Sequence, residues 1–420
     1  MAKIWKIPGL FALGFSSLSA VQAADQTPTR RIIAFREATS AELRVSIAAA
    51  SGGRIVRQLQ LINAVVIEMP ATRVHATETS LKAVPQVVRI DDDPKINWLT
   101  GAQAPSDFQL PEYRSLLQPI RRRYRAAPGL PKLEDLPAAG QQVPWGIKRV
   151  NAAGAWAKTK GKGVRIAVID TGIDYSHPDL RANVAGGWNA TNKEKPEDYM
   201  DDNGHGTHCS GTIAALDNDA GVVGIAPEAS LYGVKVLDAN GSGTFDDVIA
   251  GMQWAVEHRM QVASMSLGTP KGNDSLKAAV QAMAKNGVVL IVAAGNSGIP
   301  PQGSKSSVGY PAAYAGAIAI AASDASDKVA YFSSRGPEVA LIAPGVDVDS
   351  LAPGGGIAQM SGTSMAAPHA AGLAALAISA RGISGVEAVR AALQAAAVKL
   401  PGAPDTEQGA GLVDAAMLVR

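Results

Sequence analysis

Cysteine is nearly absent from this 420-residue chain, which has only Cys209 and therefore cannot close a disulfide within itself. A protein with a large core does not need disulfides, so this count leaves the compartment open. Aromatic residues are also scarce, at 5%, and the formal net charge is only +2. Because nucleic-acid binding requires a concentrated basic face, this near-neutral balance argues against a nucleic-acid partner.

Long apolar stretches are missing too, except at the N-terminus. Lys3 and Lys6 precede an apolar stretch over residues 7–21, and Val21-Gln22-Ala23 has small side chains at the positions that a signal peptidase reads. The stretch is too short and too rich in Ser and Gly for a membrane span, which predicts a secretory signal over residues 1–23. The alternative is an ordinary buried helix. We expect a secreted protein without membrane contact after signal removal, although a periplasmic protein would carry the same signal.

Residues 24–97 are expected to form a small α+β domain. Strands are expected over 31–37, 54–60, 64–69 and 86–90, and helices over 39–50 and 72–82. The first helix opens with Thr39-Ser40-Ala41-Glu42, which has the spacing of a capping box that starts at Thr39. The resulting order, β-α-β-β-α-β, is the ferredoxin-like pattern.

Residues 98–140 are expected to be a linker, because they contain several prolines and no sustained apolar periodicity. They include the basic run Arg121-Arg122-Arg123-Tyr124-Arg125. This run is either a processing site or a solvated linker face, and the sequence favours neither reading.

Residues 141–420 are predicted to form one large α/β domain. Apolar, β-branched strands are expected at 164–169, 288–294 and 318–321, and an amphipathic helix at 245–259. Alternation of such strands with helices predicts a mostly parallel sheet covered by helices on both faces.

Three side chains of this domain have the chemistry of a nucleophilic catalyst. Asp170 ends a predicted strand, His205 lies between two glycines, and Ser364 stands at the start of an Ala-rich helix. A serine nucleophile needs a base that takes its proton and a third group that orients the base. Taken singly, Asp170 or Ser364 could simply cap a turn or a helix. His205 with His208 also suggests a zinc pair, but no carboxylate partner accompanies them.

The segments around these residues resemble the three active-site signatures of the subtilisin-like serine proteases. They read Asp170-Thr171-Gly172-Ile173-Asp174, His205-Gly206-Thr207-His208-Cys209-Ser210-Gly211-Thr212 and Ser361-Gly362-Thr363-Ser364-Met365-Ala366-Ala367-Pro368-His369. The resemblance covers essentially all of residues 141–420 and implies the subtilisin-like fold. It implies Ser364 as nucleophile, His205 as general base and then acid, and Asp170 as the group that orients His205.

The resemblance also implies the oxyanion and substrate sites. Residues 292–298 are similar to the family's oxyanion-hole segment, which makes Asn296 the side-chain donor beside the N–H of Ser364. The segments that would bind an extended peptide as an added strand are Gly241, Ser242 and Gly243, and Ser266, Leu267 and Gly268. Gly295 and Gly309 would leave room for a large P1 side chain. Ser297 stands where many relatives carry an acidic residue, which favours an apolar P1.

A structural calcium ion is the next implication. The loop at residues 216–222 resembles the family's high-affinity calcium loop, and its oxygen-rich composition suits a hard cation. The implied ligands are Gln141, Asp179, Asn218 and the carbonyl oxygens of Leu216, Ala220 and Val222. The alternative is a loop that is merely capped by its own side chains.

Residues 24–97 look like the inhibitor-type propeptide of this family. This implies a self-processing precursor whose own propeptide acts as an intramolecular inhibitor, with cleavage expected near residues 136–140. We expect a monomer that acts on proteins and peptides. Cys209 is expected to be a small buried residue, and its place beside the catalytic His predicts sensitivity to mercurials.

Two other functions remain as alternatives. The chain could be a secreted binding module with an inactive site, or a serine hydrolase that acts on esters or lipids. The presence of every required side chain argues against the first. The strand-binding segments and the inhibitor-like N-terminal region argue against the second.

Overall fold

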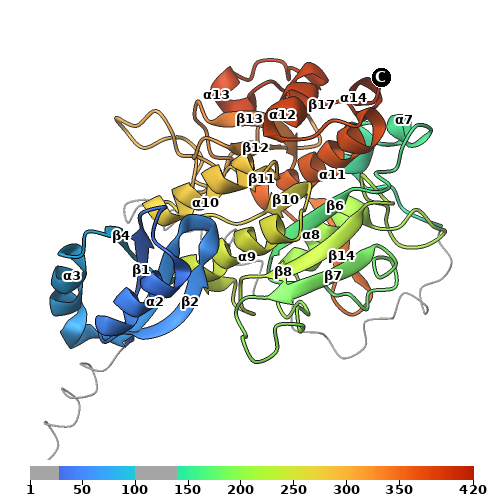
Figure 1. Cartoon of the computed structure of the whole chain (residues 1–420). Coiled ribbons are helices and arrows are strands. Elements are labelled where there is room, and N and C mark those ends of the chain that lie inside the picture. Colours follow the sequence, from blue (N-terminus) through green and yellow to red (C-terminus); the bar gives the residue numbers. More distant parts are fainter. Residues whose placement is uncertain (1–27, 100–139) are drawn as a thin grey trace, which may run out of the picture. The chain divides into compact units, whose positions relative to one another are not determined.

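The computed structural model describes residues 28–99 and 140–420 and divides them into two compact units. The smaller unit comprises residues 28–58 and 63–92, and the larger one comprises 59–62 and 93–420. The expected signal, the basic run at 121–125 and the expected cleavage positions 136–139 lie outside the described residues. Figure 1 shows the elements of each unit.

The smaller unit has a four-stranded sheet with the order β2-β3-β1-β4. Its elements are β1 (Pro28–Phe35), α2 (Ala41–Ala50), β2 (Arg54–Leu59), β3 (Ala64–Pro70), α3 (Val74–Lys82) and β4 (Val87–Asp92), with the short 3-10 helices η1 (Gln60–Ile62) and η2 (Ala71–Arg73). This is the β-α-β-β-α-β order expected from the sequence. The expected cap was wrong by one residue, because the Ser40 side chain accepts from the Leu43 N–H and α2 begins at Ala41.

The larger unit is built on a nine-stranded sheet with the order β16-β17-β13-β12-β11-β10-β6-β8-β7. Its strands are β6 (Arg165–Asp170), β7 (Val184–Asn189), β8 (Ser230–Lys235), β10 (Val262–Met265), β11 (Val289–Ala293), β12 (Ala317–Ser323), β13 (Val339–Pro344), β16 (Ala397–Val398) and β17 (Leu412–Val413). Every neighbouring pair is parallel except β16 with β17. All residues of β11 are buried, as expected for a central strand of such a sheet.

Helices flank this sheet, as the sequence predicted. They are α6 (Trp145–Arg149), α7 (Ala153–Trp156), α8 (His205–Ala214), α9 (Phe245–Glu257), α10 (Asp274–Lys285), α11 (Thr363–Arg381), α12 (Val386–Ala395), α13 (Asp405–Gln408) and α14 (Ala415–Leu418). α9 packs with α10 and α8 packs with α11, and all four contact strands of the sheet. The expected helix at 245–259 is α9, which starts with a capping box between Thr244 and Asp247.

Two antiparallel strand pairs lie outside the main sheet. They are β14 (Val348–Ala352) with β15 (Gly356–Met360), and β5 (Lys95–Asn97) with β9 (Ser242–Thr244), both antiparallel.

Among the described helices no single one is long and apolar enough to cross a membrane, and α11 with α12 meets that test only as a pair bent by 101°.

The chain order of the strands reverses at β6, which lies between β8 and β10. In open α/β sheets such a reversal leaves a crevice at the carboxyl ends of the strands, where functional groups collect. Asp170 is the last residue of β6. The topology therefore places this carboxylate at the crevice.

Two buried histidines predict a loss of stability in acid. Burial, with the charge of His205, lowers the pKa of His208 to about 3, and burial lowers the pKa of His369 to about 4. In the unfolded chain both titrate near 6.5, so from about pH 6.5 down to 4 the unfolded state binds protons that the folded state does not. The free energy of unfolding should therefore fall as the pH falls through this window, by about 1.4 kcal/mol per pH unit for each group.

The variant His369→Leu tests this expectation in a Ser364→Ala background, which lacks the candidate nucleophile. Its free energy of unfolding, measured by urea titration between pH 4 and 6.5, should depend less steeply on pH than that of its parent. His75→Gln, an exposed position, is the matched control. Equal slopes in all three proteins would contradict the assignment of a neutral, buried His369.

Candidate active site

The centre of the candidate site is a buried pair, Asp170 and His205. His205 Nδ1 lies 2.8 Å from Asp170 Oδ1, and this same oxygen accepts the N–H of Thr171 at 2.7 Å. The other carboxylate oxygen, Oδ2, is buried without a hydrogen-bond partner. The negative charge of Asp170 is therefore offset mainly by the imidazole.

The pair forms because helix α8 begins close to the end of β6. A Cβ atom at Gly206 would overlap the carbonyl oxygen of Gly172, so only glycine allows this approach. The Gly206 N–H donates to Thr171 Oγ1 at 2.9 Å. The glycine after His205, noted from the sequence, thus lets the imidazole reach Asp170.

A second buried carboxylate, Asp201, holds the start of α8 in place. Its two oxygens accept five hydrogen bonds, from Thr171 Oγ1 (2.9 Å), Asn203 N (3.0 Å), Gly204 N (2.8 Å), Thr207 N (2.8 Å) and Thr207 Oγ1 (2.6 Å). Anionic groups are favourable at a helix N-terminus, where backbone N–H groups are unpaired. Asp201 thereby ties the end of β6 to the helix that carries His205.

The electrostatics of His205 favour its protonated form. Burial alone would lower the pKa of this imidazole, but the charge of Asp170 raises it well above its usual value. A general base must be neutral to accept a proton. The arrangement therefore supports activity that rises with pH as His205 loses its proton.

Ser364 is the second residue of α11, and its hydroxyl donates to the carbonyl oxygen of Ser266 at 3.0 Å. The carbonyl oxygen of Ser364 itself accepts from Ser266 Oγ and from Cys209 Sγ. Because a hydroxyl has one proton, Ser364 must turn away from Ser266 before it can donate to His205. Cys209 Sγ also lies 4.0 Å from His205 Nδ1, which places the two catalytic candidates on either side of one sulfur atom.

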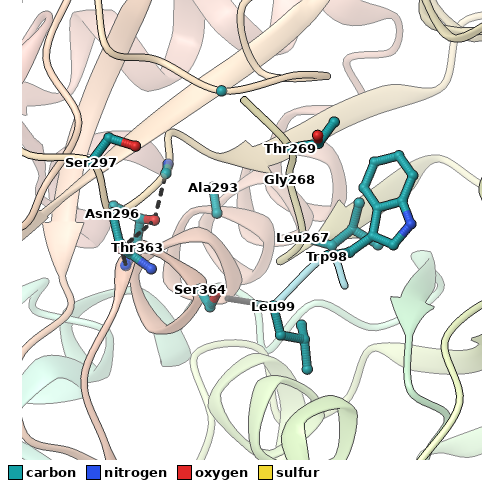
Figure 2. Close-up of a pocket in the computed structure, with 12 residues that line it drawn as sticks. Trp98, Leu99, Leu267, Gly268, Thr269, Ala293, Asn296, Ser297, Thr363 and Ser364 are labelled. Carbon is teal, nitrogen blue, oxygen red and sulfur yellow. Dashed lines mark hydrogen bonds between the residues drawn. The ribbon is translucent and has the colours of Figure 1, made fainter. Parts of the chain in front are cut away.

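Asn296 is oriented by Thr363. Its side-chain oxygen accepts from both the backbone N–H and the hydroxyl of Thr363, each at 3.0 Å. The Thr363 hydroxyl in turn accepts the N–H of Gly295 at 3.1 Å. With its oxygen engaged in this way, Asn296 presents its NH₂ group to the pocket, where a donor to a developing oxyanion is required (Figure 2).

A pocket beside Ser364 is lined by half of the residues expected to bind substrate, namely Leu267, Gly268, Gly295 and Gly309. It is lined by Trp98, Leu99, Leu267, Gly268, Thr269, Ala293, Gly295, Asn296, Ser297, Gly309, Thr363 and Ser364 (Figure 2). Gly295 and Gly309 leave its wall without side chains, and Leu267 and Ala293 make it apolar. The residues Ser266 and Gly241–Gly243 lie outside the lining but contact Ser364 or the segment described next.

The cleft contains a segment that the sequence interpretation had assigned to the end of one domain and the start of a linker. β5 pairs with β9 in the register Lys95↔Thr244, Ile96↔Gly243 and Asn97↔Ser242. Beyond it, the Trp98 N–H donates to Gly241 O at 2.9 Å, and the Gly268 N–H donates to Trp98 O at 3.0 Å. The strand-binding segments expected for substrate therefore hold a piece of the chain itself.

The expected calcium ligands also converge. Gln141 Nε2 lies 2.5 Å from Leu216 O, 3.2 Å from Val222 O and 3.5 Å from both Ala220 O and Asn218 Oδ1. Asp179 adds a carboxylate whose oxygens accept from Asn218 Nδ2 and Val222 N, and burial raises its pKa to about 6. Four oxygens around one point, next to a carboxylate, fit a hard cation once the Gln141 amide turns its own oxygen inward.

The two histidines of the His205 motif do not form a metal pair. His208 Nε2 faces the carbonyl oxygens of Val348 and Ala358, at 3.0 and 3.2 Å. Within the described ranges, the side chains close enough to share an ion are Asp170, His205 and Cys209. These are the catalytic candidates and the adjacent thiol.

The buried Cys209 thiol predicts inhibition by mercurials. Burial raises the pKa of this thiol, so it reacts slowly with alkylating agents, whereas Hg²⁺ binds sulfur strongly and would sit against His205. If the site has the activity that the sequence resemblance implies, stoichiometric HgCl₂ should reduce that activity at least tenfold, and Cys209→Ala should retain it in the presence of HgCl₂. Equal inhibition of the wild type and Cys209→Ala would contradict this prediction.

Sequence reasoning missed three features of the site. Thr363 belongs to the motif around Ser364, but its contact with Asn296 joins segments 67 residues apart in the sequence. Asp201 stands four residues before His205 and was not singled out, although an acidic residue just before a helix is a recognisable capping signal. Trp98 and Leu99 carried no signal, because their contacts depend on pairing with a strand about 145 residues away.

Comparison with known proteins agrees with this geometry. The profile of the subtilase family matches residues 161–411. Subtilisin E of Bacillus subtilis (strain 168) is 38% identical over 376 residues, covering 88% of this chain and 86% of the relative. Subtilisin of Bacillus pumilus is 48% identical over 240 residues, or 57% of this chain and 86% of that protein. A thermostable alkaline protease of Halalkalibacterium halodurans is 48% identical over 237 residues, or 56% of this chain and 63% of that protein.

Proposed function

Since the chain belongs to the subtilase family of serine endopeptidases, we propose that it is secreted as a self-processing precursor and then hydrolyses proteins after large apolar residues. The observation that carries this proposal is the buried Asp170–His205 pair, which Cys209 Sγ links to Ser364, together with a cleft that already binds an extended peptide segment. An esterase or lipase does not need strand-binding edges of this kind. The geometry therefore favours peptide substrates.

In the proposed reaction Ser364 attacks the scissile carbonyl while His205 takes the hydroxyl proton and Asp170 stabilises the resulting imidazolium. The Asn296 side chain and the Ser364 N–H donate to the oxyanion. His205 then protonates the leaving amine, and water releases the acyl group by the same steps. The apolar pocket with glycines at 295 and 309 supports a large apolar P1, and Ser297 at its rim brings no charge that would attract a basic one.

The precursor proposal rests on the smaller unit and on the segment in the cleft. The smaller unit has the element order expected of the inhibitor-type propeptide, and residues 95–99 occupy the positions of a peptide substrate. As long as this segment remains bound, it would exclude external proteins from the cleft. We propose cleavage within residues 100–140, which contain the positions 136–140 favoured from the sequence.

Purified full-length chain tests the proposal directly. Its size should fall with time as the N-terminal region is removed, and casein cleavage should appear in parallel. Ser364→Ala should stay full length and inactive, and N-terminal sequencing of the wild-type product would locate the bond. If the wild type and Ser364→Ala both remain full length and inactive while folded, the site is not a working peptidase.

We further propose that Gln141, Asp179, Asn218 and three loop carbonyls bind a structural calcium ion. The support is the convergence of these oxygens described above. When bound, the ion would neutralise the Asp179 carboxylate and crosslink residue 141 to the loop that follows α8. Because the ion would bind the folded state only, it would stabilise that state by mass action.

Removal of calcium should lower the melting temperature of the Ser364→Ala protein. A ligand at 100 times its dissociation constant contributes about 2.7 kcal/mol, which corresponds to roughly 5–10 °C in a domain of this size. Asp179→Asn should lose this response to EDTA. Asp217→Asn, in the same loop but paired with Lys160 at 2.6 Å, should keep it. If EDTA leaves the melting temperature of the Ser364→Ala protein unchanged, the proposed calcium site is contradicted.

A further inference from the structure

The segment in the cleft defines a register for any peptide that binds there. A substrate that uses the backbone groups of Gly241, Gly243 and Gly268 is held by the same bonds that hold residues 95–98. Each side chain of the segment therefore marks the place of one substrate side chain. At two of these positions, those of Trp98 and Lys95, the side chain makes specific contacts with the cleft.

The first is the place of Trp98, which serves as a reference point. Its side chain is only 1% exposed, packs edge-on against Phe245 with ring centroids 5.0 Å apart, and donates from Nε1 to Gly243 O at 3.0 Å. Such a buried aromatic side chain fixes the register more firmly than backbone bonds alone.

The second is the place of Lys95, three residues earlier. Lys95 Nζ lies 2.6 Å from Asp238 Oδ2. The other oxygen of Asp238 accepts the N–H groups of Asn240 and Ser242, at 2.9 and 3.0 Å. The turn that leads into β9 therefore holds the carboxylate with Oδ2 directed at the Lys95 position, before any cation arrives.

We propose that Asp238 is a specificity subsite for a basic side chain, located three residues N-terminal to the substrate residue that takes the place of Trp98. The inference rests on the proposed endopeptidase function and adds a substrate class to it. Departure of the cleft segment removes Lys95 but leaves the turn bonds of Asp238 in place. The open cleft then presents a fixed, unpaired carboxylate to incoming substrate.

The pKa of the Asp238 carboxyl lies below its usual value, which favours the charged form. Partial burial would raise the pKa of this carboxyl, but Lys95 and the N–H groups of the turn lower it overall. The two N–H donors remain after Lys95 leaves. The turn already holds the carboxylate in place, so a substrate lysine does not have to order it. The conformational entropy lost on forming this ion pair is therefore smaller than in a typical surface ion pair.

Two matched peptides test the subsite. One is a fluorogenic peptide with the sequence of residues 94–103, and the other differs only by Glu in place of Lys95. With peptidase matured from the full chain, we expect kcat/KM to be about tenfold higher for the Lys peptide, with the preference decreasing at high salt. Asp238→Asn keeps an oxygen for the turn and should reduce the preference to less than about twofold.

The control is Asp324→Asn, because Asp324 Oδ1 accepts turn bonds with the same spacing, from Ser326 N and Lys328 N, but belongs to a turn outside the β5–β9 pair that holds residues 95–97. It should keep the full preference, and mass spectrometry should show the same bond cut in both peptides. The subsite is refuted if the wild type has equal kcat/KM for both peptides, or if Asp238→Asn lowers kcat/KM for both by the same factor. The proposed peptidase function would still hold in either case. If neither peptide nor casein is cleaved, the proposed function fails and the subsite with it.

Discussion

Replacing His205 with alanine should lower kcat for peptide hydrolysis about 10⁶-fold, because the general base that takes the Ser364 proton would be lost. This magnitude was obtained on subtilisin, a relative of this chain, and is carried over here. The loss should appear in kcat with little change in KM, since the cleft edges that bind the peptide are untouched. Single-turnover measurements on a fluorogenic peptide would detect the residual rate.

Asp170→Asn provides a graded comparison. An amide at this position keeps the size of the side chain but removes the charge that raises the pKa of His205. The expected loss is smaller, about 10⁴-fold. His258→Gln, at an exposed position, should leave kcat unchanged. A loss of less than 100-fold in His205→Ala would mean that another group takes the serine proton.

Asn296→Leu should reduce kcat by about 10²–10³, a magnitude that again comes from subtilisin. The leucine side chain has similar volume but no N–H, so the oxyanion keeps only the backbone donor at Ser364. Substrate binding before attack does not use this donor, and KM should therefore change little. Ser297→Ala, one residue further along, should behave as wild type.

Thr363→Val tests how much the orientation of the Asn296 amide contributes, because the variant keeps the Asn296 donor itself. Valine cannot supply the hydroxyl that donates to Asn296 at 3.0 Å, but the backbone N–H of residue 363 still holds the same oxygen. We expect a loss of roughly tenfold, well below that of Asn296→Leu, because one of two hydrogen bonds remains. A loss as large as that of Asn296→Leu would show that the hydroxyl alone orients the amide.

The elements that sequence analysis predicted well are those defined by local patterns. The strand that ends at Asp170 and the helix 245–257 follow from runs of β-branched residues and from apolar periodicity. The Asp-His-Ser order was visible because each residue stands in a long motif. The register of the cap at Ser40 was missed by one position, because two adjacent hydroxyl residues offer the same signal.

The parts of the site that could not be predicted depend on contacts between distant segments. The clamp of Thr363 on Asn296, the ion pair of Lys95 with Asp238 and the pairing of β5 with β9 each join residues far apart in the chain. Nothing in the local sequence around Lys95 distinguishes a strand in a cleft from the start of a linker. Only the folded sheet edge at residues 242–244 makes that segment a strand.

The larger unit holds both ends of the stretch 100–139, with Leu99 in the cleft and Gln141 against the proposed calcium loop. While the chain is intact, the blocking segment is tethered, and its effective concentration at the cleft does not depend on the concentration of the protein. A single cut within the stretch makes the segment a separate ligand. Under the proposed precursor function, inhibition after the cut would follow ordinary mass action, and dilution would by itself open the active site.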